Sequence, residues 1–97
     1  MTDDDKQRAL QHLAQKVASA REAWQAEISA AFDELHQLDP ELVTEVVQVF
    51  GRKMGAINYL ANKQIDYEEP DCYAALAAGK RERILYVIRA LASGNLI

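Results

Sequence analysis

Apolar residues recur at steps of three and four along the first 38 residues, where neither glycine nor proline occurs. They are Leu10, Leu13, Val17, Ala20, Trp24, Ile28, Ala31, Leu35 and Leu38. Because such steps keep residues on one side of an α-helix, the spacing predicts one amphipathic helix over about residues 3–38. Thr2 and the three aspartates after it form a strong helix start, since a hydroxyl caps free amides and carboxylates suit the positive end of the helix dipole.

This predicted helix is too long for a chain of 97 residues to cover. At 1.5 Å per residue it would extend about 54 Å, beyond the diameter of a compact domain of this size. Either the helix breaks around residues 19–26, or part of its apolar side packs on another chain. We expect the second outcome, with the exposed part serving as an interaction surface that also allows a homodimer through this helix.

A second helix is predicted over about residues 40–63. Asp39 is a good N-cap and Pro40 suits the first helical position, so the first helix must end near Leu38. Valines are frequent from 43 to 50, but apolar residues at 43, 46, 47, 50, 54 and 57 have helical spacing. In a continuous helix, Gly51 and Gly55 would mark a place where another helix crosses closely.

The last third of the chain predicts two short helices after an acidic loop. Residues 65–71 contain four acids and a proline, and Asp71 can cap a helix over about 71–78. Gly79 would end that helix, and a last helix over about 80–93 would stop at Gly94 and Asn95. A single helix over 71–93 is the alternative. The sequence thus predicts an all-α fold, an irregular bundle of three to four helices forming a single helical domain, 1–97.

Composition and charge narrow the classes of function that we expect of this chain. The chain has 15 acidic and 11 basic residues, a net charge of −4, whereas a general nucleic-acid binder is basic. No stretch approaches the ~20 apolar residues that span a bilayer. Cys72 is the only cysteine, which excludes an intrachain disulfide and fits a reducing compartment. With an acidic start lacking the apolar run of a secretory signal, these features predict a cytoplasmic protein.

The sequence offers little support for catalysis. His12 and His36 are 24 positions apart on one predicted helix, too far to share a metal ion. Cys72 has no histidine nearby in sequence, and there is no glycine-rich phosphate loop. We therefore expect no enzyme activity, no metal site and no cofactor.

The remaining features predict a protein-interaction module that regulates or inhibits a larger complex. Small accessory proteins of phages and mobile elements often have this physical character. One version of the prediction is therefore an inhibitor of that type, which docks on a host nucleic-acid-processing enzyme. The candidate contact residues are Trp24, Ile28 and Phe32 on the first helix and Tyr67, Glu68, Glu69 and Pro70 in the acidic loop.

The alternative is a small helix-turn-helix DNA-binding regulator using residues 46–63. Gly51 would then form the turn, and the charge of this segment is slightly positive. The residues that would reach DNA are Arg52, Lys53, Asn58 and Lys63.

Overall fold

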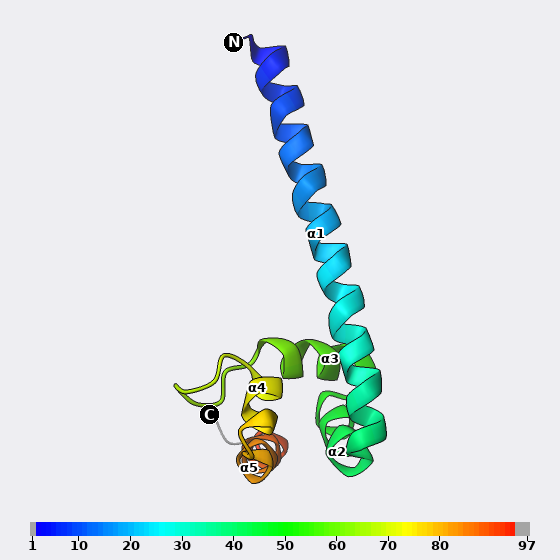
Figure 1. Cartoon of the computed structure of the whole chain (residues 1–97), viewed down its shortest axis with the longest axis vertical. Coiled ribbons are helices and arrows are strands. Elements are labelled where there is room, and N and C mark those ends of the chain that lie inside the picture. Colours follow the sequence, from blue (N-terminus) through cyan, green and yellow to red (C-terminus); the bar gives the residue numbers. More distant parts are fainter. Residues whose placement is uncertain (1, 95–97) are drawn as a thin grey trace.

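The computed structural model describes residues 2–94, which form an all-α fold of five helices, as the sequence predicts in class. The helices are α1 (Asp3–Leu38), α2 (Pro40–Phe50), α3 (Lys53–Asn62), α4 (Cys72–Ala77) and α5 (Arg81–Ala92) (Figure 1). One helix more than expected is present because the segment predicted as a single helix over 40–63 is broken in two.

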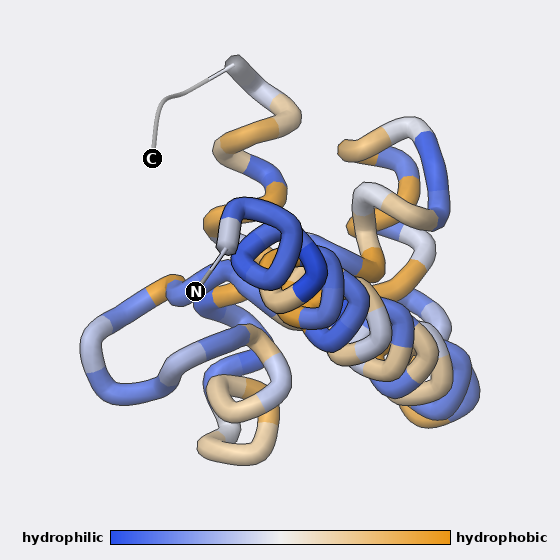
Figure 2. Tube along the Cα trace, turned by 90° about the horizontal axis from the view of Figure 1, so that it is seen from above, coloured by the Kyte–Doolittle hydropathy of each residue, from blue (hydrophilic) through white to orange (hydrophobic). Residues whose placement is uncertain are grey.

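Helix α1 is continuous from end to end, with the bounds that the periodicity predicts. Thr2 caps it, because its side-chain oxygen accepts a hydrogen bond from the backbone N–H of Asp5 at 3.2 Å. The break considered around residues 19–26 does not occur. Figure 2 shows apolar and polar positions alternating turn by turn along α1, as expected for a helix with one apolar side.

The prediction of one helix over 40–63 is wrong. Helix α2 ends at Phe50, and Gly51 follows with a φ of 73°, the left-handed conformation that terminates helices and that glycine adopts without strain. Arg52 is extended, and α3 begins at Lys53. The close crossing of another helix that we expected at Gly55 is also not found. The nearest atom to a Cβ added there is the Cβ of Phe50, the last residue of α2, at 3.2 Å.

The two C-terminal helices match their predicted ranges to within one or two residues. Asp71 caps α4 by accepting a hydrogen bond from the backbone N–H of Ala74 at 2.9 Å. Gly79, with a φ of 82°, separates α4 from α5, so the alternative of one helix over 71–93 is wrong. Gly94 also has a positive φ, as a terminating glycine should, while Asn95 lies outside the described residues.

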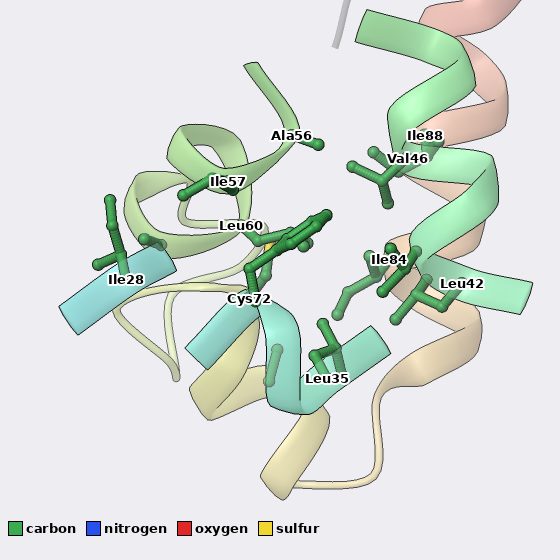
Figure 3. Close-up of a cluster of buried hydrophobic side chains, with 14 of the residues drawn as sticks. Ile28, Leu35, Leu42, Val46, Ala56, Ile57, Leu60, Cys72, Ile84 and Ile88 are labelled. Atoms are coloured by element: carbon green, nitrogen blue, oxygen red, sulfur yellow. The ribbon is translucent and has the colours of Figure 1, made fainter. Parts of the chain in front are cut away.

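All five helices contribute to one hydrophobic core (Figure 3). Its largest fully buried side chains are Phe32, Leu42, Leu60, Ile84, Ile88, Val46 and Cys72. Of α1, only the C-terminal part reaches this core. We call residues 3–24 the arm and residues 25–94 the head. The arm projects from the head, and the chain measures 56 × 29 × 27 Å (Figure 1).

Candidate interaction surface

The arm carries a row of large apolar side chains that the chain itself leaves uncovered. Leu10, Leu13, Val17 and Trp24 are 48%, 53%, 56% and 50% exposed. Together with the exposed Ala20, we call this row the arm face. Scattered apolar residues are normal on a protein surface, whereas a contiguous row marks an interaction site.

The arm face continues the side of α1 that packs on the head. At about 100° per residue, Leu10, Val17 and Trp24 lie within about 20° of Leu35 around the helix axis. Leu35 is buried against the head. The head therefore ends where the arm face begins, and whatever covers the arm face must lie next to the head on the same side of α1 (Figure 1).

The charges along the arm are divided into blocks. From Lys6 to Arg21 the sequence contains four basic residues and no acidic one. Asp3, Asp4 and Asp5 precede this block, and two glutamates follow it. A partner of the arm face thus meets positive charge along most of the row and negative charge at its N-terminal end.

The predicted first-helix contact residues separate into two environments. Trp24 is half exposed on the arm face, as a contact residue must be. Ile28 and Phe32 are 4% and 2% exposed and belong to the core. A partner cannot reach these two side chains, so we no longer count them among the contact residues. They have the same spacing as the arm residues, and only the packing of the head on this part of α1 distinguishes them.

Part of the negative charge of the acidic loop is balanced by one lysine of the same chain, Lys80. The ammonium group of Lys80 lies 2.9 Å from a carboxylate oxygen of Asp66, 3.1 Å from one of Glu68 and 2.9 Å from one of Glu69. The hydrogen bond from Lys80 holds the pKa of Asp66 well below its usual range. The hydrogen bonds to Glu69 and Asp66 raise the pKa of Lys80.

This arrangement corrects the expectation of a freely solvated acidic docking loop. Glu69 is buried, so it cannot contact a partner as predicted. Glu68 and Pro70 are exposed, and Tyr67 is fully so. Lys80 reduces the negative charge that a basic partner would meet. Its role could not be recognised from the sequence, because it lies 11 to 14 positions beyond the acids.

A second ion pair fixes the joint at the end of α1. Asp39 accepts hydrogen bonds from the Arg81 guanidinium at 2.6 and 3.1 Å, and its side chain also caps α2 through the N–H of Leu42. The hydrogen bond from Arg81 lowers the pKa of Asp39. This pair connects the α1–α2 joint to the start of α5.

The α2–α3 segment has the helix break that a helix-turn-helix requires, but one of its basic residues, Lys53, is directed toward α1. Arg52, Lys53, Asn58 and Lys63 are all exposed. Lys53 lies toward α1, 3.4 Å from the carboxylate of Asp33 and over the ring of Phe32. The side of α3 that faces away from the core presents Gly55, Asn58 and Asn62.

Cys72, the one cysteine of the chain, lies in the core. Burial raises the pKa of the Cys72 thiol to about 11, and the thiol contacts the carbonyl of Lys63 at 3.5 Å. Within residues 2–94, no three His, Cys, Asp or Glu side chains are grouped so as to hold a metal ion. A surface hollow of about 400 Å³ is lined by Pro40, Glu41, Thr44 and Glu45.

No protein-family model, curated protein or solved structure matches this chain. Among the helices that the structure describes, none combines the length and the apolar character needed to cross a membrane.

Proposed function

We propose that this chain is a non-enzymatic protein-interaction module whose working surface is the arm face. One observation carries the proposal: four large apolar side chains on one side of an unbroken helix are each about half exposed. On the same side, Ile28, Phe32 and Leu35 are buried where the head packs on the helix. Burying such side chains is worth about 1.5–3 kcal/mol each, so a partner that covers the arm face gains substantial free energy.

The shape of the arm face favours a protein partner over a small molecule. Small ligands bind in concave pockets, whereas the arm is a convex helix standing clear of the head (Figure 1). Leu10, Leu13, Val17 and Trp24 have the i, i+3, i+7 and i+14 spacing of anchors with which a helix enters a groove or pairs with another helix.

A module of this kind regulates or inhibits a larger complex by occupying one of its surfaces, and we place that activity in the cytoplasm. We assign the electrostatic contribution to partner binding to the arm rather than to the acidic loop. The loop carboxylates already have Lys80 as a counter-ion, whereas the basic block from Lys6 to Arg21 has no acid within it. A host nucleic-acid-processing enzyme remains one proposed target.

The test compares Leu13→Glu with Gln15→Glu. Both variants add one negative charge to the arm, but Gln15 lies on the side of the helix opposite the arm face. Each immobilised chain is used to capture proteins from native cell extract, followed by mass spectrometry. We expect Leu13→Glu to lose the proteins that the natural chain and Gln15→Glu retain, with an unchanged melting temperature in dilute, monomeric protein. Equal capture by all three chains would contradict the proposal.

A DNA-binding regulator remains the second candidate, because α2 and α3 are separated by a true turn at Gly51. The outward side of α3 weighs against it, since two asparagines and a glycine there supply no charge for phosphate contacts. A salt-dependent gel shift that is abolished by the double variant Arg52→Ala and Lys53→Ala would favour DNA binding over the protein-interaction proposal.

A further inference from the structure

We infer that a second copy of this chain covers the arm face from Leu10 to Ala20, with the two arms packed side by side in antiparallel orientation. The inference rests on the proposed function, because it takes the arm face to be a protein-binding surface, and it names the partner that covers this surface in the isolated protein. Three features of the molecule carry it: the amount of uncovered surface, the position of the head, and the order of charges along the arm.

The uncovered surface is of the size that a dimer needs. The chain exposes 6956 Å², whereas a compact protein of its mass exposes about 5,600 Å². If two copies each bury about half of the excess, the interface totals about 1,400 Å², within the usual range for specific protein contacts.

The position of the head excludes a parallel pair of arms. In a parallel pair the two helices face each other along their whole length. The head, however, packs on the side of α1 that continues the arm face, so each head would occupy the space of the other helix. A parallel pair would also set Lys16 beside Arg21 of the second copy, two like charges at flanking heptad positions.

An antiparallel pair has no such conflict, and the sequence selects one register. With Leu10 of each arm level with Leu13 of the other, two leucine layers form around the two-fold axis. Val17 then lies level with Lys6, whose aliphatic part can cover it while the ammonium group stays in water. Asp3 comes level with Ala20, within reach of the guanidinium of Arg21, so opposite charges meet.

The length of the free arm fits this register. The paired helices end level with Ala20, one turn before the head begins at Gln25, whose side chain donates to the sulfur of Met54 at 3.1 Å. A shift by one heptad brings Asp3 level with Glu27 and runs the second arm into the head. That shift also pairs Lys16 with Lys16, two like charges across the axis.

The first measurement is sedimentation equilibrium of the full chain over about 5 to 500 µM, a range suited to an interface of modest size. We expect the mean mass to rise from 10.9 kDa toward twice that value, and to do so for Gln15→Glu as well. Leu13→Glu is expected to remain at the mass of one chain throughout. A natural chain that stays monomeric over the whole range overturns the inference.

The second measurement tests orientation by oxidation of introduced cysteines in a Cys72→Ala background. A mixture of Leu10→Cys and Leu13→Cys chains is expected to form a disulfide between the two different chains, because these positions share a layer. Each variant alone is expected to cross-link far less. Self-linking of Leu13→Cys at the same rate as in the mixture overturns the antiparallel arrangement.

The outcomes separate this inference from the proposed function. A monomer whose capture of other proteins still depends on Leu13 overturns the homodimer and leaves the proposed function standing. If the chain is monomeric and Leu13→Glu captures the same proteins as the natural chain, both the homodimer and the proposed function are overturned. A monomer that instead binds phosphatidylglycerol vesicles through Leu13 also overturns the inference, and would make the basic arm a membrane-surface helix.

Discussion

Phe32 and Trp24 lie eight positions apart on α1 but in opposite environments. Phe32 is 2% exposed in the core, while Trp24 is half exposed on the arm face. We expect Phe32→Ala to lower the free energy of unfolding by about 3–5 kcal/mol, because it leaves a cavity that the core cannot fill. Trp24→Ala should lower it by less than about 1 kcal/mol in dilute, monomeric protein.

Urea unfolding followed by far-ultraviolet circular dichroism measures both effects. The natural chain at the same concentration is the reference, and Gln15→Glu controls for a substitution on the exposed arm. A loss for Trp24→Ala as large as that for Phe32→Ala would mean that the chain covers Trp24 itself, contrary to the structure.

The sequence places Trp24 in the apolar row and Phe32 beside it, on the same side of the helix, but does not show which of the two is covered. The period of three and four continues from Trp24 through Ile28 to Leu35 without a change that marks the start of the core. Whether a member of the row is covered depends on where the head reaches α1. That limit is set by contacts with α3, such as Met54 with Gln25, which are 29 positions apart in the sequence.

At the scale of helices, the joint between α1 and α2 depends on Asp39, which both caps α2 and pairs with Arg81. Asp39→Ala removes both interactions, and loss of the cap alone costs about 1 kcal/mol. Asp39→Asn keeps a capping oxygen and removes the charge. We therefore expect both variants to melt below the natural chain at neutral pH, and Asp39→Ala to melt at the lower temperature.

The pH dependence of this difference has a definite sign. Since the pair with Arg81 lowers the pKa of Asp39 in the folded chain, its stabilisation is complete above the unfolded-state value near 3.9. It is lost as the pH falls through the lower, folded-state value. The melting temperatures of the natural chain and Asp39→Asn should therefore approach each other as the pH falls below about 4, and meet below the folded-state pKa of Asp39. A gap that persists there would show that the charge of Asp39 is not its cause.

Helix positions were predictable where local signals agree, as in α1, α4 and α5. Thr2, Asp39 and Asp71 each cap a helix start, as their side chains predict. The break between α2 and α3 was missed because the apolar period continues across it from Val46 to Ile57. The ion pair of Asp39 with Arg81 joins residues 42 positions apart, a distance at which a single sequence gives no pairing signal.

The central feature of the whole molecule is that it has more apolar surface than its own chain can bury. The sequence predicted this from length and periodicity alone, since the first helix exceeds the diameter of a compact domain. The radius of gyration is 17.7 Å, whereas about 12.5 Å is expected for a compact chain of 97 residues. The head contains a complete core, so the arm is available for a partner.

Small-angle X-ray scattering of Leu13→Glu in dilute solution tests most directly whether the arm projects uncovered from its own chain. The substitution keeps the protein monomeric, so the scattering reports the shape of one chain. We expect a radius of gyration near the 17.7 Å of the structure. A value near 12.5 Å, that of a compact chain, would mean that the arm folds back and covers its own apolar face.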